Sequence, residues 1–414
     1  MAARKKKVSV SLMSRAFAFS EEFSDLFRYG SLGLIICILG DLIAGIELGS
    51  LGNILELLPG LVILVPPAMG MRGNIYGAFA SRLGTSMHMG TFTPSLMKDT
   101  VLAKNLKASV LLTLFLSVTL GVVAKLVAYT FGHEALTISE YIFISFLGGI
   151  ISAILLLPIV VAISIIGFSK GWDIDNFSAP MITAFGDVVT IPALYIAAIS
   201  AMKISMHPMG LDLISGMILI TTIPIFVCGI REGGLVSRIF KESVPLLLFT
   251  STIGSFGGFL IHTRLEVMIK LAAILVLIPP FLGVNNALGG ILAARLSSML
   301  HMGIIYPRKI PERAAIKNFI AIYAFSLIIF PLVGLLTHVL GEVLGFTSPG
   351  PLVLIAMSLI AGIISTLAVS AIAYMVAAAS FKLGADPDIH SIPLTSSTID
   401  LIGILSIILT LGLF

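Results

Sequence analysis

The chain has 414 residues, 57% of them hydrophobic and 11% charged, with a mean hydropathy of +1.10 and a formal net charge of +4. A water-soluble domain carries roughly a quarter charged residues, so this composition excludes a soluble protein. The apolar runs are about as long as a membrane-spanning helix requires, which favours an all-α polytopic membrane protein over a transmembrane β-barrel. The basic residues lie mostly in short segments between these runs, as in cytoplasmic loops, so the charge does not predict a nucleic-acid partner.

The first predicted element is a cytoplasmic N-terminal segment, residues 1–30. It holds a basic cluster from Arg4 to Lys7, and a mixed stretch follows where a signal peptide would have a short apolar core. The first repeat then runs over residues 31–201 and contains five predicted membrane helices. They lie near 31–49, 57–85, 107–130, 141–168 and 180–201.

A linker at residues 202–226 follows. It contains the start of an extra transmembrane helix at 211–229, whose apolar run is long enough to span a membrane. The second repeat covers residues 227–414 and contains five more predicted helices. They lie near 244–262, 270–298, 318–341, 351–381 and 392–413.

The two repeats follow from one internal alignment. Residues 66–90 match residues 279–303 with 10 identities in 25 positions. The same register, continued without a gap, pairs Asp187 with Asp400. We therefore interpret the chain as two copies of one five-helix unit.

The odd number of helices in each repeat decides their relative orientation. Two five-helix units joined directly would be inverted, whereas the extra helix at 211–229 makes them parallel and brings the total to eleven spans. The predicted loops on the same side of the membrane as the N-terminus hold most of the Lys and Arg residues. The positive-inside rule therefore places the N-terminus inside and, with eleven spans, the C-terminus outside. Parallel halves are related by a pseudo-two-fold axis along the membrane normal, and we expect a pathway at their interface.

Two aspartates at corresponding positions, Asp187 and Asp400, lie inside the last predicted helix of each repeat. An acid within a membrane is costly and by default faces a bundle interior or a water-filled path. The helical period places Thr183 on the same face as Asp187, and Ser396 on the same face as Asp400. We expect the two carboxyl groups to converge on the axis. The alternative is a buried protonated acid that hydrogen-bonds to a neighbouring helix.

Asp41 is a third acid in an apolar segment, but Gly254 stands at the corresponding position of the second repeat. Its role stays open between a local hydrogen-bonding or modulating group and an ion ligand. Two acids also precede each aspartate-bearing helix, where they suit either a helix N-terminus or an acidic cytoplasmic vestibule for a cation. These acids are Asp173, Asp175, Asp386 and Asp388.

The segment after each Pro-Pro pair places small and amide residues on one helix face. Small residues at this spacing usually indicate close helix packing. The amides Asn74 and Asn286 also need a polar partner or water inside a membrane, which makes them candidate ion ligands. Together with the acids and hydroxyls they form a set of hard oxygen donors, suited to Mg²⁺, Ca²⁺ or Mn²⁺ and unsuited to copper or structural zinc.

Residues 66–74 and 173–187 resemble the membrane domain of the MgtE magnesium channels, and the tandem arrangement resembles the solute carrier family 41 divalent-cation transporters. The resemblance implies that two five-helix units place their helix-five aspartates around a hydrated Mg²⁺. Carried over, it assigns the ion site to Asp187 and Asp400 and places the whole pore within one chain. MgtE proteins also carry large cytoplasmic sensor domains, and we expect no gating by such domains here. Ala179 and Ile392 replace an amide that some relatives have before the helix-five proline.

The sequence therefore predicts transport of a divalent cation, Mg²⁺, by a multi-pass protein of the cell membrane whose partners are the lipid bilayer and the ion. The main alternative is an exchanger of Mg²⁺ against Na⁺ or H⁺, because the same acids bind either ion. A remote alternative is an intramembrane aspartyl protease. Residues 184–187 resemble the Gly-x-Gly-Asp motif of such proteases, but alanine stands in place of the first glycine of the motif. The repeat symmetry favours transport, so we predict no catalytic residue and no resident cofactor.

Overall fold

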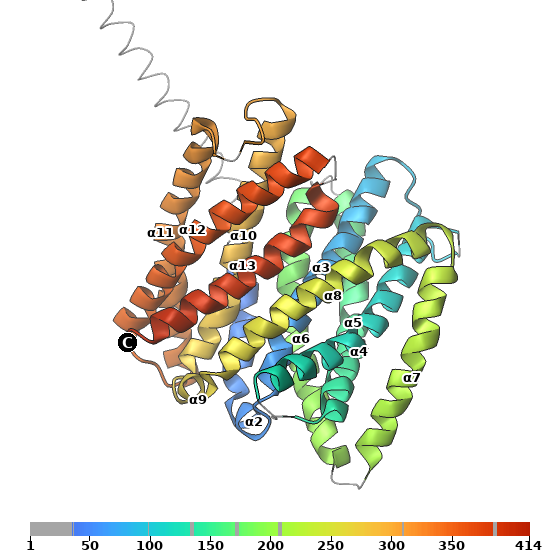
Figure 1. Ribbon diagram of the computed structural model, residues 1–414, viewed down its shortest axis with the longest axis horizontal. Coiled ribbons are helices and arrows are strands. Elements are labelled where there is room, and N and C mark those ends of the chain that lie inside the picture. The colour runs from blue at the N-terminus through green and yellow to red at the C-terminus, as the bar shows by residue number, and fades with distance from the viewer. Residues whose placement is uncertain are drawn as a thin grey trace, which may run out of the picture.

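The computed structural model describes residues 35, 37–97, 99–132, 136–169, 174–205, 209–308, 310–383 and 387–414. The side chains of residues 168, 174–180, 383 and 387–392 lie outside that description. Within the described ranges every regular element is an α-helix, without a β-strand, as the sequence predicted. The long helices lie side by side in one bundle (Figure 1).

The helices follow the predicted order. After a helix at 37–50, the first half contains α2 (Gly52–Leu57), α3 (Leu61–His88), α4 (Val101–Thr130), α5 (Ile138–Ser169) and α6 (Ile174–Ser205). The extra helix is α7 (Gly210–Arg231). The second half contains α8 (Gly234–His262), α9 (Leu265–Lys270), α10 (Ala273–His301), α11 (Arg313–Leu344), α12 (Pro351–Leu383) and α13 (Pro387–Leu411).

The short helices α2 and α9 are elements that the sequence analysis did not predict. They occupy corresponding positions in the two repeats, each just before the second long helix of its half. Several long helices also extend beyond the predicted segments; α6, for example, begins at Ile174 and not near residue 180. Hydropathy marks only the apolar part of a helix, whereas its hydrogen-bonded backbone continues into the polar interface.

Nine helices in the described part of the chain are long and apolar enough to cross a membrane, so the protein is a polytopic membrane protein. Two of the eleven predicted spans are not among these nine. The helix at 37–50 adjoins residues that the structure leaves undescribed. The 28-residue α3 carries Arg72, Asn74 and two prolines, which lower its mean hydropathy. The eleven spans and the inside–outside orientation remain predictions.

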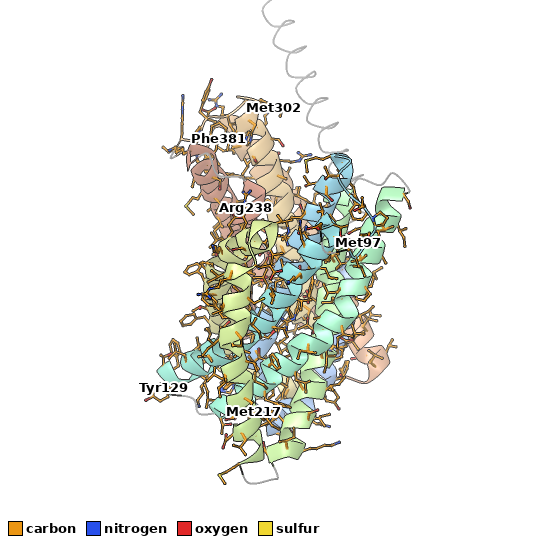
Figure 2. All side chains as sticks on the ribbon, turned by 90° about the vertical axis from the view of Figure 1, so that its right-hand side faces the viewer. Met97, Tyr129, Met217, Arg238, Met302 and Phe381 are labelled. Atoms are coloured by element: carbon orange, nitrogen blue, oxygen red, sulfur yellow. The ribbon has the colours of Figure 1, made fainter. Side chains whose placement is uncertain are left out.

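Figure 2 shows the two ends of the bundle. Side chains of two loops and two helix ends gather toward one end, and two other side chains lie toward the opposite end. The first group is Met97, Arg238, Met302 and Phe381, and the second is Tyr129 and Met217. All four members of the first group belong to segments that the charge pattern predicted to be cytoplasmic. Segments predicted to share one side of the membrane therefore lie at one end of the bundle.

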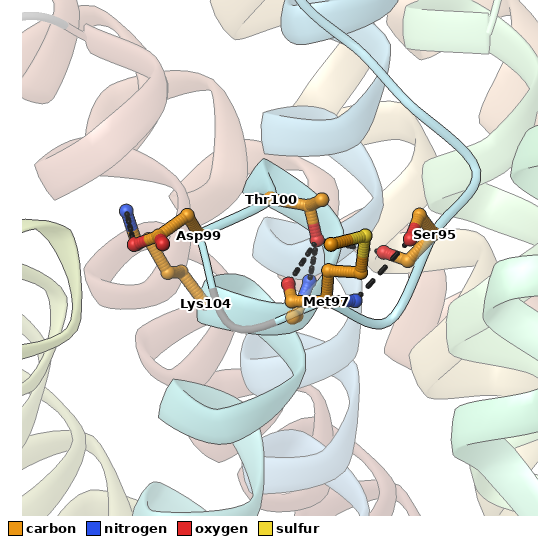
Figure 3. A network of polar contacts seen from close by, with 6 residues as sticks. Ser95, Met97, Asp99, Thr100 and Lys104 are labelled. Carbon is orange, nitrogen blue, oxygen red and sulfur yellow. Dashed lines mark hydrogen bonds and ion pairs between the residues drawn. The ribbon is translucent and has the colours of Figure 1, made fainter.

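The loop before α4 shows how one helix start is fixed (Figure 3). Thr100 is the N-cap residue: its side-chain oxygen accepts a hydrogen bond from the N–H of Ala103 at 3.2 Å, and its hydroxyl donates to the carbonyl of Ser95 at 2.6 Å. Lys104 and Asp99 form an ion pair at 3.5 Å, which is exposed and contributes little to stability. The cap therefore starts the long helix directly after Thr100.

The core of the bundle is built on α3 and α10. Buried residues run along almost the whole of α3, and 72% of the most apolar stretch of α10 is buried. By contrast, only 17% of the most apolar stretch of α7 is buried. This helix packs on α4 and α5 at the edge of the bundle (Figure 1). The paired prolines that the repeat shares thus lie in the two most central helices.

The first helix of each half crosses to the second helix of the other half. Gly258 of α8 lies so close to α3 that a methyl group there would be 2.6 Å from the carbonyl oxygen of Ile63. Its counterpart Gly45 lies in the same way against the backbone of Val276 in α10. Glycine is needed at both crossings because any side chain would overlap with the neighbouring backbone. These crossings join the two halves around α3 and α10.

One polar contact also occurs in both halves. The Nε of Arg82 donates to Oδ1 of Asn105 at 2.7 Å, and at the corresponding positions of the second half Nη1 of Arg295 donates to Oδ1 of Asn318 at 3.2 Å. Each pair ties the second long helix of its half to the third. The recurrence supports the interpretation of the chain as two copies of one unit, whose exact boundaries remain a prediction.

Candidate ion site

Asp187 and Asp400 lie in the middle part of two long helices, α6 and α13. Helix α6 packs against α3, and α13 packs against both α8 and α10. The side chain of Asp187 is buried, and that of Asp400 is half-buried. A methyl group on Gly70 of α3 would lie 4.0 Å from the Oδ2 of Asp400. One turn further along α3, the backbone nitrogen of Gly73 is 3.8 Å from the position that a methyl group on Gly186, next to Asp187, would take. The structure therefore brings together the two acids that the sequence predicted to converge.

Asp41 joins this pair. Its side chain is only 2% exposed and comes from the helix at 37–50. The carboxyl group lies against Gly283 of α10, one turn before Asn286, whose side chain donates to Asp400. The sequence left this residue open between a local role and an ion ligand, although an acid in an apolar segment was a signal. The structure thus gathers three carboxyl groups where the repeat predicted two.

Asn286 of α10 holds one of the acids. Its side-chain amide donates to Oδ1 of Asp400 at 2.7 Å. Its own Oδ1 is buried and has no hydrogen-bond partner among the described residues. A carboxylate fixed by an amide, next to an unpaired amide oxygen, presents oxygen donors suited to a hard cation.

Thr183 and Asn74 belong to α6 and α3, two helices of the first half that pack against each other. The Cγ2 of Thr183 is 3.3 Å from the position that a methyl group on Gly73 would take, so α6 packs closely on α3 there. The Nδ2 of Asn74 is buried, and no described residue hydrogen-bonds to it. Ser396, the counterpart of Thr183, donates its hydroxyl to the carbonyl of Pro393 at 3.2 Å, which leaves its oxygen lone pairs for another partner. Contact of these side chains with an ion remains a prediction.

The structure does not describe the side chains of the four acids that the sequence assigned to a helix N-terminus or a vestibule. Asp173 and Asp386 lie outside the described residues. Asp175 and Asp388 are the second residues of α6 and α13, so they lie in the first helical turn and not in a loop before the helix. The helices pass through their prolines, as at Pro393, because membrane helices tolerate an interior proline. The side chains of all four acids are undescribed, so both roles considered for them remain predictions.

Two buried polar residues at corresponding positions were not among the predicted site residues. Arg72 is 1% exposed, and its Nη2 lies 3.5 Å from the Oγ of Ser117 in α4. Its Nε has no hydrogen-bond partner in the described part of the chain, and the same holds for both amide atoms of the fully buried Asn285. The guanidinium lies toward α4, while the acids come from other helices. A basic residue inside an apolar segment was the signal that would have marked Arg72.

The donor set of the site consists of carboxylate, amide and hydroxyl oxygens, which suit a hard divalent cation. Among the described residues, no three Asp, Glu, His or Cys side chains are close enough to hold one metal ion together. Asp41, Asp187 and Asp400 therefore do not form a complete ligand shell around one cation.

The chain matches the MgtE family, described as a divalent cation transporter, over residues 65–197 and 278–410. The two matched regions begin and end at corresponding positions of the internal repeat. Each region contains one of the paired acids, Asp187 or Asp400. Asp41 lies ahead of the first region.

The chain is also similar to animal solute carriers. It is 25% identical over 391 residues to solute carrier family 41 member 2 of Xenopus laevis, covering 87% of this chain and 68% of that protein. It is 25% identical over 364 residues to member 2 of Gallus gallus, covering 82% of this chain and 62% of that protein. It is 24% identical over 364 residues to member 3 of Mus musculus, covering 83% of this chain and 73% of that protein. The chain matches no solved structure.

Proposed function

The chain belongs to the MgtE family of divalent cation transporters, and on that premise we propose that it carries Mg²⁺ across the cell membrane past Asp187 and Asp400. The observation that carries this proposal is that α3 contacts both acid-bearing helices in neighbouring turns, α13 at Gly70 and α6 at Gly73, and that each acid lies in a family-matched region. A cation path explains why each half holds a costly acid within the membrane. We assign the halves as residues 31–201 and 227–414, so that a single chain forms the pore at their interface.

We propose Mg²⁺ as the transported ion because the site offers oxygen donors in an open arrangement. Mg²⁺ gives up its water reluctantly and usually keeps several waters when it binds to proteins. In this proposal the two acids neutralise the ion, and the neighbouring polar side chains hold its water shell. These side chains are Asn74, Thr183, Asn286 and Ser396.

For the mechanism we propose conduction down the electrochemical gradient. Selective conduction requires binding strong enough for entry and weak enough for release, which suits an ion held through water. The second candidate is exchange of Mg²⁺ against Na⁺ or H⁺, and the presence of a third acid, Asp41, favours it. An aspartyl protease gains no support, because the matched family is one of transporters.

The test is ion uptake into liposomes that contain the purified full chain, at a fixed membrane potential. We expect uptake of Mg²⁺ to exceed that of Na⁺, with Mn²⁺ and Ca²⁺ measured in parallel. Asp187→Asn and Asp400→Asn should each lower Mg²⁺ uptake at least about tenfold, which corresponds to ~1.4 kcal/mol. Asp99→Asn, an exposed acid in the loop before α4, is the control and should transport normally. Normal uptake by Asp187→Asn at an unchanged protein level would contradict the proposed site.

A further inference from the structure

Asp41 takes no part in the conduction pathway proposed above, yet its side chain lies with the acid pair. It is 2% exposed, and it lies one turn of α10 away from Asn286, whose side chain donates to Asp400. The buried guanidinium of Arg72 lies against Ser117 of α4 and does not pair with Asp41. A carboxyl group buried to this extent within a membrane is costly unless a cation or a hydrogen-bond donor compensates for it.

The carboxyl group of Asp41 sits directly on the backbone of α10. Its Oδ2, Cγ and Oδ1 are the three atoms nearest to the position of a methyl group on Gly283, and the Oδ2 would overlap with that methyl group. A methyl group on Gly70, the counterpart of Gly283 in α3, would lie 4.0 Å from the Oδ2 of Asp400, which is an ordinary contact distance. Corresponding positions of the two central helices therefore each lie beside a carboxyl group, but only Gly283 must be glycine to leave room for it.

The second half has no room for a matching acid. Gly254 corresponds to Asp41, and a methyl group on Gly254 would be 2.8 Å from Cα and 2.9 Å from Cβ of Pro67. Any longer side chain would collide with α3 because helix backbones in contact leave no free space. Packing thus excludes a fourth acid at the position of Gly254, so the charge of the site is asymmetric although its helices are repeated.

We infer that Asp41 is a third ion-binding carboxylate, which sets how strongly the site prefers divalent to monovalent cations. This inference rests on the function proposed for Asp187 and Asp400. A fixed negative charge attracts a divalent ion twice as strongly as a monovalent ion at the same distance. A third carboxylate beside the pair therefore raises the affinity for Mg²⁺ more than the affinity for Na⁺.

Asp41→Asn in the full chain tests this role, with Mg²⁺ and Na⁺ as the measured ions. In liposomes at a fixed potential, we expect the Mg²⁺ concentration for half-maximal uptake to rise about tenfold and the ratio of Mg²⁺ to Na⁺ uptake to fall by a similar factor. Equilibrium binding of Mg²⁺ to the detergent-purified protein, measured by calorimetry, should weaken in parallel.

Gly283→Ala is a second variant, because it keeps the charge of Asp41 and displaces its carboxyl group. As for Asp41→Asn, we expect the Mg²⁺ concentration for half-maximal uptake to rise and the ratio of Mg²⁺ to Na⁺ uptake to fall. Gly290→Ala is the matched control in the same helix, since no heavy atom lies within 4 Å of the added methyl group. It should behave as the unaltered chain. Thermal unfolding in detergent shows whether each variant folds.

Unchanged Mg²⁺ affinity and an unchanged ion ratio in a folded Asp41→Asn variant would overturn the role of Asp41. If that variant does not fold, Gly283→Ala decides: a lower ion ratio than in Gly290→Ala supports the role, and an equal ratio overturns it. Failure of the proposed function has a different signature, because Asp187→Asn would then take up Mg²⁺ normally.

Discussion

Asp187 and Asp400 come from different halves of the chain, on two helices that both contact α3. Residues that act on the same ion are non-additive, because either substitution alone already disrupts the site. We therefore expect the Asp187→Asn/Asp400→Asn double variant to lose little Mg²⁺ uptake beyond the worse single variant. Initial uptake rates in liposomes measure this. Two independent sites would instead give a double variant whose loss is the product of the two single losses.

The residues of the site differ in how far the sequence predicts them. Asp187 and Asp400 were predictable because a costly acid occurs at the same position in both repeats. Asn286 was predictable as an amide that needs a partner, but its hydrogen bond to Asp400 depends on how α10 packs against α13. The place of Asp41 was not predictable, because its contact with Gly283 joins different halves of the chain and has no counterpart in the other half.

Among the helices, the crossing of α8 over α3 offers a direct test of how the halves are joined. Gly258→Val would push a side chain into the backbone of Ile63, and overpacking of this kind costs about 1–3 kcal/mol. We expect a lower midpoint of thermal unfolding in detergent, followed by circular dichroism. Gly216→Val in α7 is the matched control, because no heavy atom lies within 4 Å of the added methyl group. Equal midpoints for the two variants would contradict the close crossing.

The order of the long helices was predictable from the apolar runs, but their ends and the short helices were not. Helix α6 begins at Ile174, ahead of the proline that served as the expected start. Proline is common in the first turn of a helix, but a membrane helix also tolerates it further inside, so it is an ambiguous marker. The six-residue helices α2 and α9 are too short to give a periodic signal.

For the molecule as a whole, the parallel arrangement of the halves predicts which residues share one side of the membrane. Tyr129 and Met97 lie toward opposite ends of the bundle (Figure 2), and Glu342 and Ile310 are their counterparts in the second half. Single cysteines at Tyr129 and Glu342 should both react with a membrane-impermeant reagent added outside intact cells. Cysteines at Met97 and Ile310 should react only after the membrane is permeabilised. The background chain carries alanine in place of its two native cysteines.

Opposite labelling of Tyr129→Cys and Glu342→Cys would mean that the halves are inverted. Such an arrangement would require an odd number of spans between the two positions, and α7 would then not cross the membrane. The 22-residue length of α7 and its apolar composition argue for a crossing, since about 20 apolar residues span a bilayer. Parallel halves also place the acids of α6 and α13 at the same depth in the membrane.

The driving force is the property of the whole molecule that separates a channel from an exchanger. A membrane potential acts on each elementary charge that crosses it with about 2.3 kcal/mol per 100 mV, so a divalent ion that passes without a counter-ion gains twice that amount. We expect an inside-negative potential to accelerate Mg²⁺ uptake into liposomes. At a fixed potential, an imposed Na⁺ or H⁺ gradient should leave the rate unchanged. Uptake that requires an opposing gradient of Na⁺ or H⁺ would instead favour exchange, because the energy for Mg²⁺ movement would then come from the second ion.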